Sequence, residues 1–297
     1  MFLPMRMQRP RTGFTLAEMA IVVLIIGIAM TMGLKMVTAT LENTAYSETQ
    51  SKQERIKLAL IGFMRTNGRL PCPDSAAGVP TGAEAATCAT AVTAYGVVPW
   101  QTLGLPREAT QDGWGNFFTY RVANFANATL VAAGPATPPL HPRINQNWAV
   151  RTGFDIVSYA NAATTPGYQS LLINTSGGVA EARNVVAVIL SHGKNGLGAK
   201  TVASPTRIAI AGAGADETTN ATAATTTFVR RPVTDSTAAP GGAYDDLLMP
   251  LTPQDLLQPL MNEKTLLGVC QAYCAAPGAG CTTTVAIPVG NSPLTCP

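Results

Sequence analysis

The first sixty residues carry a pattern of hydrophobic and polar positions that predicts one long helix. Residues 14–34 form a mainly apolar run with one charged residue, Glu18. As a helix they extend over about 31 Å, which matches the hydrocarbon thickness of a bilayer. Residues 42–55 are mostly polar, and apolar side chains then recur at helical spacing from Ile56 to Met64. We therefore expect a helix over residues 14–66, with a membrane-spanning part at 14–34 and an amphipathic part at 35–66.

Polar residues on either side of this helix set its orientation and its end. Arg6, Arg9 and Arg11 precede the apolar run without any acidic residue, so the positive-inside rule puts residues 1–13 in the cytoplasm and the rest outside. Asn67-Gly68 and the prolines at 71 and 73 end the helix by turn chemistry. Residues 67–297 are then expected to form a globular domain outside the cytoplasm.

Beyond residue 67 the chain changes to short apolar runs between turns, which predicts a β-rich domain. The 27 glycines and 22 prolines of the whole chain favour turns. Loops are expected at 71–106 and, as a mobile low-complexity surface loop, at 211–227. We expect strands at 117–122, 154–159, 170–173, 185–190 and 207–210. The fold class is therefore α+β, with the helix packed on an antiparallel sheet.

The net charge of the chain gives no case for nucleic-acid binding. The formal charge is +3, from 20 basic and 17 acidic residues. Three of the arginines lie before Gly13, and removing them leaves 17 basic against 17 acidic residues. A nearly neutral domain lacks the basic surface that nucleic-acid binding requires.

Six cysteines point to disulfide bonds in an oxidising compartment. An even number of cysteines in a chain with an export-like N-terminus favours disulfides over free thiols. We expect Cys72 to pair with Cys88, and four further cysteines to pair among themselves and close a C-terminal region at 244–297: Cys270, Cys274, Cys281 and Cys296. The alternative is that these four bind zinc, but their spacing lacks the paired C-x₂₋₄-C arrangement of structural zinc sites.

The residues around Gly13 carry a resemblance to a known family. Gly13-Phe14-Thr15-Leu16-Ala17-Glu18 follows a short basic leader and opens the apolar run. This segment resembles the class III signal peptide of type IV prepilins and type II secretion pseudopilins. The resemblance implies that a prepilin peptidase cuts between Gly13 and Phe14 and that Phe14 is N-methylated. It also implies that Glu18 directs assembly with other pilin or pseudopilin subunits.

The same resemblance implies a type IV pilin fold and a location. The precursor would cross the inner membrane once, with its globular domain in the periplasm, and would meet an inner-membrane assembly platform before entering a pilus or pseudopilus. The Asp112-Gly113-Trp114-Gly115-Asn116 segment is similar to the one that opens the first sheet strand of major pseudopilins. A chain of this size is expected to be a minor subunit. The alternative function is an adhesin-like or cargo-binding module displayed on a pilin helix.

An ordinary secretory signal is the competing reading of the N-terminus. Val37-Thr38-Ala39 would serve as the cleavage site and would release a soluble protein. Such signals have apolar regions of about 7 to 15 residues. The apolar run here is longer and contains a carboxylate, which costs about 2.5 to 3.5 kcal/mol in a membrane unless it is paired.

The polar residues of the domain do not form a recognisable catalytic motif, and we expect no enzymatic activity. The chain has two histidines, His141 and His192. Ser191 is too close in sequence to His192 for a strand to direct both side chains at one another. Residues 191–199 are glycine-rich but lack the Gly-Lys-Ser/Thr ending of a phosphate-binding loop.

The glycine-rich stretch at 191–199 has one further interpretation. Major pseudopilins carry a glycine- and aspartate-rich loop after a strand that binds calcium. The partial similarity implies weak calcium candidates at Asn195, Asp245 and Asp246. We expect no cofactor, with calcium as the alternative.

Overall fold

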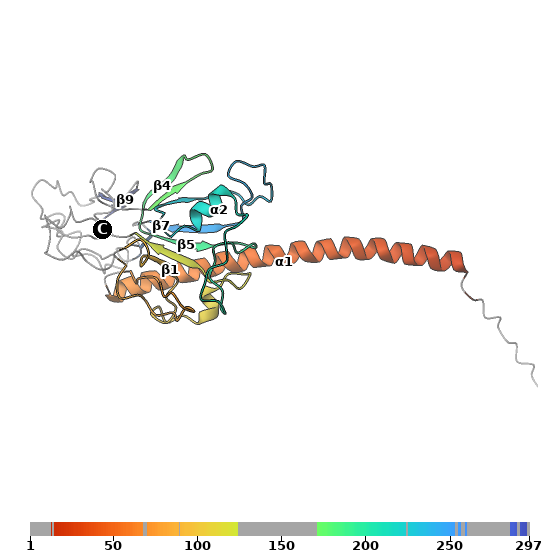
Figure 1. Ribbon diagram of the computed structural model, residues 1–297, viewed down its shortest axis with the longest axis horizontal. Coiled ribbons are helices and arrows are strands. Elements are labelled where there is room, and N and C mark those ends of the chain that lie inside the picture. Colours follow the sequence, from red (N-terminus) through yellow and green to blue (C-terminus); the bar gives the residue numbers. More distant parts are fainter. Residues whose placement is uncertain are drawn as a thin grey trace, which may run out of the picture. The chain divides into compact units, whose positions relative to one another are not determined.

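A computed structural model describes residues 13, 15–67, 70–88, 90–123, 171–223, 225–252, 255–256, 259, 286–289 and 292–295. The chain divides into two compact units, residues 1–46 and residues 47–297. The long helix α1, Leu16–Asn67, begins in the first unit and ends in the second (Figure 1). The predicted N-terminal helix is confirmed.

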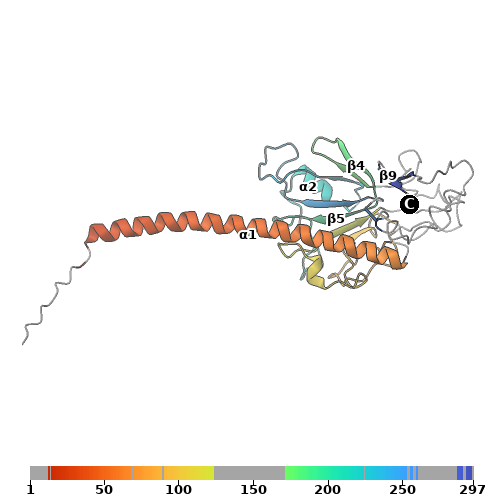
Figure 2. The same ribbon diagram turned by 180° about the vertical axis from the view of Figure 1, so that it is seen from behind.

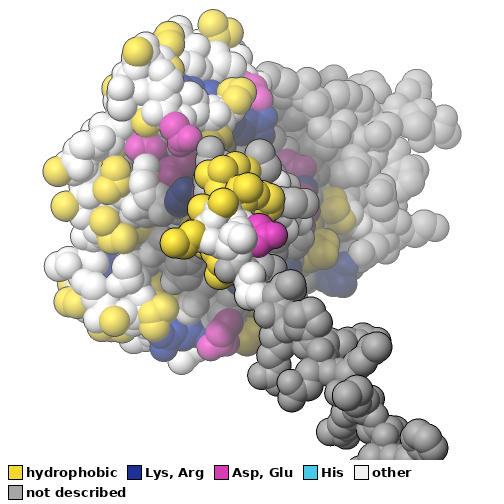
Figure 3. All heavy atoms as spheres, turned by 90° about the vertical axis from the view of Figure 1, so that its right-hand side faces the viewer, with side chains coloured by type: hydrophobic (Ala, Val, Ile, Leu, Met, Phe, Trp, Pro, Cys, Tyr) yellow, Lys and Arg dark blue, Asp and Glu magenta, His cyan; other side chains and the backbone are white. Residues whose placement is uncertain are grey.

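The first part of α1 exposes its apolar side chains. Between Leu16 and Met30, each large hydrophobic residue is between 45% and 93% exposed. Figure 3 shows hydrophobic side chains crowded around the end of the described helix that faces the viewer. Among the residues that the structure describes, no helix reaches both the length and the hydropathy of a membrane span.

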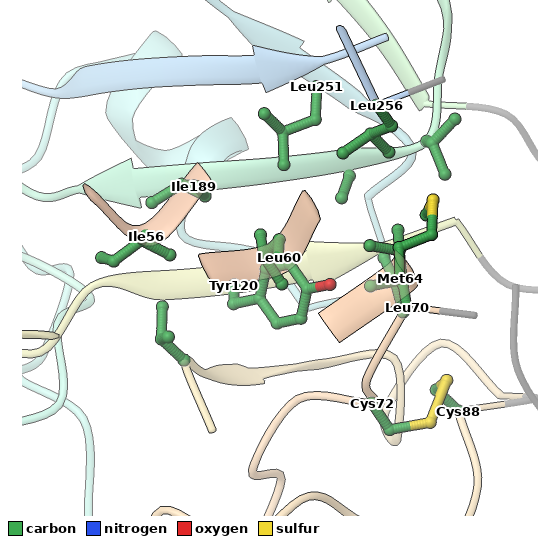
Figure 4. Packing of buried hydrophobic residues seen from close by; sticks show 14 of the residues in the cluster. Ile56, Leu60, Met64, Leu70, Cys72, Cys88, Tyr120, Ile189, Leu251 and Leu256 are labelled. Atoms are coloured by element: carbon green, nitrogen blue, oxygen red, sulfur yellow. A yellow bond between two sulfur atoms is a disulfide. The ribbon is translucent and has the colours of Figure 1, made fainter. Parts of the chain in front are cut away.

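A four-stranded antiparallel sheet forms the centre of the second unit. Its strands, in the order β1-β2-β5-β7, are Tyr95–Val97, Thr119–Val122, Ala187–Ser191 and Leu247–Leu251. The last part of α1 lies alongside these strands in both ribbon views (Figures 1 and 2). Ile56, Leu60 and Met64 are fully buried against Tyr120 and Ile189 (Figure 4). The predicted amphipathic stripe is therefore the face by which α1 holds the sheet.

Three polar residues of α1, four positions apart, accompany the apolar stripe. Thr49 Oγ1 accepts a backbone N–H from the turn before β2, and Lys57 Nζ lies 3.4 Å from a carboxylate that follows β7. Between them, the Gln53 amide donates to the carbonyls of Ile189 and Leu247, at 3.2 and 2.9 Å. Since hydrogen bonds are directional, these contacts fix the rotation of the helix on the sheet more narrowly than apolar packing does.

A smaller sheet has the order β4-β3-β6, with strands Ala180–Val185, Leu171–Asn174 and Thr227–Val229. Strand β3 pairs antiparallel with β4 and parallel with β6, so this sheet departs from the purely antiparallel expectation. A separate hairpin joins β8, Ala286–Val289, to β9, Ser292–Thr295. The predicted strands at 117–122, 170–173 and 185–190 are confirmed, with a break at Val186 between β4 and β5.

Two local predictions are wrong. Residues 207–210 form no strand, and Arg207 makes only an isolated bridge with Lys200. Residues 211–227, expected to be a mobile loop, contain the helix α2, Ala215–Asn220, whose Glu217 and Asn220 are buried. The loop prediction for residues 211–227 was wrong because amino-acid composition carries no information about the hydrogen bonds that these side chains make to distant strands. The predicted strand at 154–159 lies outside the described residues.

The loop after α1 is closed by a disulfide. Cys72 and Cys88 are bonded and buried, which confirms the predicted pair (Figure 4). Inside the loop, Asp74 accepts the N–H groups of Thr81 and Gly82 at 2.7 Å. Lys200 donates to two of the loop's carbonyls. The region 71–106 is thus an ordered loop with one short strand, β1, and it leads into the 3₁₀ turn η1, Arg107–Thr110. The other four cysteines lie outside the described residues: Cys270, Cys274, Cys281 and Cys296.

Candidate functional site

The residues at the predicted cleavage site precede the helix. Gly13 is exposed and non-helical, and a Cβ added to it would meet nothing within 4 Å. Helix α1 begins three residues later, at Leu16. The backbone at Gly13 therefore has no partner within the described chain that an enzyme would need to displace. Phe14 lies outside the described residues.

Thr15 and Glu18 form a capping box at the start of α1. Glu18 Oε2 accepts the backbone N–H of Thr15 at 2.8 Å and its hydroxyl at 2.9 Å, and the Glu18 N–H donates to Thr15 Oγ1 at 3.2 Å. Such reciprocal bonds satisfy two N–H groups that a helix terminus leaves without partners. A carboxylate in the first turn also interacts favourably with the helix dipole.

A cluster of buried carboxylates lies in the second unit, beside the glycine-rich loop that follows β5. Oxygens of Glu217, Asp245 and Asp246 lie within 4.8 Å of one another, and all three residues are buried. At Gly193, with a φ of +59°, a side chain would collide with the Asp245 backbone carbonyl. Only glycine allows the loop to pack this closely on the carboxylates.

Amide groups hold the carboxylates in place. Asn195 donates from its backbone N–H to Asp245 at 2.8 Å and from its side-chain amide to Glu217 at 3.0 Å. Asn220 on α2 donates to Asp246 at 2.8 Å. Burial and the charge of Glu217 raise the pKa of Asp245 to about 7, and burial raises the pKa of Asp246 well above its ordinary value. The ionised cluster is therefore costly without a bound proton or cation.

The three calcium candidates from the sequence do lie together here. However, the side-chain oxygen of Asn195 accepts the Leu197 N–H at 2.8 Å, while its nitrogens donate to the carboxylates. Its side chain offers the cluster no oxygen, whereas calcium takes six to eight oxygen ligands. The three carboxylates whose oxygens lie close enough together to hold a cation are those of Glu217, Asp245 and Asp246.

His192 lies on the other side of Asp246, at the bottom of the same loop. It is fully buried, with Nε2 2.9 Å from Thr119 Oγ1 and Nδ1 3.8 Å from Asp246 Oδ1. Burial, together with the charge of Arg207, lowers the pKa of His192 to about 3, so the ring is neutral. The order hydroxyl, imidazole, carboxylate is that of a hydrolytic triad. These three residues are at most 4% exposed, which closes them to substrate.

Ser191 faces a different carboxylate from the one beside His192. Its hydroxyl donates to Asp112 Oδ2 at 2.7 Å. Asp112 Oδ1 accepts the N–H groups of Trp114 and Asn116, which fixes the turn before β2. Ser191 therefore supports the fold at this position.

Sequence reasoning missed Glu217, and with it the centre of the cluster. Glu217 lies in the stretch 211–227, which the sequence predicts to be a low-complexity surface loop. One signal was available, since Asp216 and Glu217 are the only acidic residues between Lys200 and Asp235. An isolated acidic pair in a neutral stretch is compatible with the first turn of a helix, where it lies in α2.

The comparisons with known proteins identify the N-terminal segment. Residues 8–34 match the family described as the prokaryotic N-terminal methylation motif, the class III signal peptide of type IV pilins and pseudopilins. No curated protein and no solved structure matches the chain. This motif supports the interpretation of the chain as a type IV pilin-like or pseudopilin-like substrate of prepilin peptidase.

Proposed function

We propose that this protein is a structural subunit, of the minor type, in a type IV pilus or a type II secretion filament. The precursor crosses the inner membrane once, with its globular domain in the periplasm. Prepilin peptidase cuts it after Gly13, Phe14 becomes the methylated N-terminus, and the assembly platform transfers the subunit into the filament. The observation that carries this proposal is the match of residues 8–34 to the methylation motif, at the start of one unbroken helix.

The exposed surface of the first part of α1 supports assembly through this helix. Its large apolar side chains, from Leu16 to Met30, have no partners within their own unit that bury them. Burying apolar surface contributes about 25 cal/mol per Å². Lipid supplies such an environment before assembly, and a bundle of similar helices supplies it afterwards.

The size of the globular domain supports the minor role. Processing after Gly13 leaves 284 of the 297 residues, more than most major pilins contain. An adhesin-like or cargo-binding domain displayed on the same helix is the rival function. Binding assays on the chain, with and without its helix, separate the two: a display module binds its ligand in both forms.

Filament recovery tests the structural role. Cells expressing the chain are sheared, the filament fraction is collected, and the N-terminal residue of the recovered subunit is determined. We expect the protein in that fraction with methylated Phe14 as its first residue. A mature protein that begins at Thr40 would instead be an ordinary secreted product.

Calcium binding near Asn195, Asp245 and Asp246 stays a prediction. Calorimetric titration of the chelator-treated chain with Ca²⁺ tests it directly.

A further inference from the structure

A groove of about 630 Å³ lies between α1 and β7 in the second unit. Helix α1 lines it with the side chains of Gln53 and Glu54, and Arg230, which follows β6, also contributes to its lining. Strand β7 supplies apolar residues: Leu248, Met249 and Pro250. Apolar surface bordered by charged groups in a concave region is typical of a site where another protein docks.

The open edge of β7 is unsuited to pairing with a further strand. Among the described strands of its sheet, β7 comes last and pairs with β5 alone. Leu251 directs its carbonyl at β5, where it accepts the Val186 N–H at 2.9 Å. Backbone groups of successive residues face opposite edges, so Leu248 and Pro250 face the open one. Because Pro250 has no N–H to donate, we expect the occupant of the groove to present side chains, as a helix does.

Glu54 is the charged residue of the groove that lacks a partner. Arg230 donates from Nε to Glu181 at 3.0 Å. Asp255, which also lines the groove, lies 3.4 Å from Lys57 Nζ. Glu54 is exposed and forms no ion pair with any residue that the structure describes. A cation on the occupant would complement its charge, and such complementarity fixes the register of an interface and suppresses wrong partners.

We propose that this groove receives the helix of a neighbouring pilin-type subunit, which inserts an apolar side chain next to a Lys or Arg. The proposal rests on the proposed function, since α1 is both the helix that enters the filament and one wall of the groove. A helix that packs alongside this part of α1 therefore meets Glu54 and Met249. The chain itself presents the required chemistry, because Leu58 is 66% exposed and Arg55, one turn before it, is also exposed.

Such a contact would join two different surfaces. Glu54 and Met249 line the groove, whereas neither Arg55 nor Leu58 is among the described residues that line it. When one surface of a subunit binds a different surface of the next, the contact repeats head to tail and builds an open helical array unless it closes into a ring. The arrangement is therefore compatible with a filament, whereas a self-complementary patch would favour a closed dimer.

Photo-crosslinking from within the groove identifies the occupant. A photoreactive phenylalanine analogue replaces Met249 in the full chain, and cells are irradiated before the filament fraction is sheared off and collected. We expect crosslinks to the helix of another subunit that carries the methylation motif, identified by mass spectrometry of the joined peptides. The same analogue at Val233, which is exposed outside the groove, should not crosslink to such a helix.

Charge reversal tests the pairing at Glu54. Glu54→Arg should lower recovery in sheared filaments by about fivefold or more, at unchanged membrane level and unfolding midpoint, because like charges in an interface are costly. The matched control is Asp235→Arg, which reverses an exposed charge outside the groove and should leave recovery unchanged. If Glu54→Arg fails to fold, the crosslinks from position 249 decide.

Failure of this proposal is distinct from failure of the proposed function. Absence of the wild type from the filament fraction would reject the filament role, and the docking site with it. If the wild type enters filaments, recovery of Glu54→Arg at the wild-type level would overturn the docking site and leave the filament role intact. Crosslinks from position 249 that reach no pilin-type helix would do the same. Crosslinks to a protein without the methylation motif would also overturn it, and would favour the display function.

Discussion

Thr15 and Glu18 bond to each other in both directions, since the Glu18 carboxylate accepts from the N–H and hydroxyl of Thr15 while the Glu18 N–H donates to that hydroxyl. In the isolated chain, the Glu18 carboxylate therefore caps the N-terminus of its own helix. In the proposed filament, the same carboxylate would pair with the positive amine that cleavage after Gly13 would create on Phe14, within one subunit or on a neighbour. These two roles can be separated by mutation.

Glu18→Ala should abolish filament entry while leaving cleavage and membrane level near normal. An unpaired charge among apolar helices is costly, so the pairing of Glu18 with an amine fixes axial register. The control is Thr15→Ala, which removes the same cap, at about 0.5 to 2 kcal/mol, but keeps the carboxylate. Recovery in sheared filaments is the measurement. Equal losses in the two variants would assign the defect to the helix cap and not to the charge.

Gly13→Val should block processing without changing the fold of the precursor. A Cβ at this position meets nothing within 4 Å, so the chain itself accommodates a side chain. The peptidase must approach this backbone closely, and a branched side chain prevents that approach. Immunoblots should show only precursor, with the unfolding midpoint of the detergent-purified chain unchanged. Normal cleavage would refute the assignment of this peptide bond.

Opening the first disulfide should destabilise the globular unit. In the chain-entropy model, closing a loop of this length contributes about 3 kcal/mol, and the double replacement of Cys72 and Cys88 by Ser should lower the free energy of unfolding by about that amount. Denaturant unfolding checks this. Thiol labelling of denatured, unreduced wild type should detect no free cysteine, including those at 270, 274, 281 and 296. Labelled C-terminal cysteines would contradict the expected pairing there.

The parts of this fold that follow from local pattern could be predicted from the sequence. Helix α1 has a helical period of apolar residues, and strand β2 follows a recognisable turn. The Cys72–Cys88 loop is marked by its two cysteines. The acidic cluster has none of these. Glu217 meets Asp245 only because 27 intervening residues fold back on themselves, and α2 is held by Asn220 bonding to both backbone groups of Val229. Contacts of this kind depend on tertiary structure and leave no periodic signal.

Gln53→Leu should destabilise the globular unit by about 1 to 3 kcal/mol. The change leaves the carbonyls of Ile189 and Leu247 without the donor they share, and an unsatisfied buried acceptor costs about that much. The matched control is Gln50→Leu, one turn earlier on the exposed face of the same helix, which should change stability by less than about 0.5 kcal/mol. Chemical denaturation compares the two. A Gln53→Leu protein as stable as the control would mean that apolar packing alone holds the helix.

The stability of the globular unit should depend on pH through Asp112. Burial raises the pKa of this carboxyl above its ordinary value, against the hydrogen bonds from Ser191, Trp114 and Asn116. As pH rises past about 4, the unfolded chain loses the proton first, because its Asp pKa is ordinary. The folded state then binds more protons than the unfolded state, so the free energy of unfolding falls until the folded carboxyl also ionises.

Asp112→Asn isolates this contribution, because the amide is similar in shape and has no charge to desolvate. Its oxygen can accept the two backbone N–H groups, and its nitrogen can donate to Ser191 Oγ. Relative to wild type, the variant should gain stability as pH rises from 4 to 7, and Asp235→Asn, at an exposed position, provides the reference for general charge effects. Urea unfolding at intervals across this range gives both curves. A constant difference between Asp112→Asn and wild type would mean that protonation of Asp112 is not linked to folding, because its hydrogen bonds offset the cost of burying the charge.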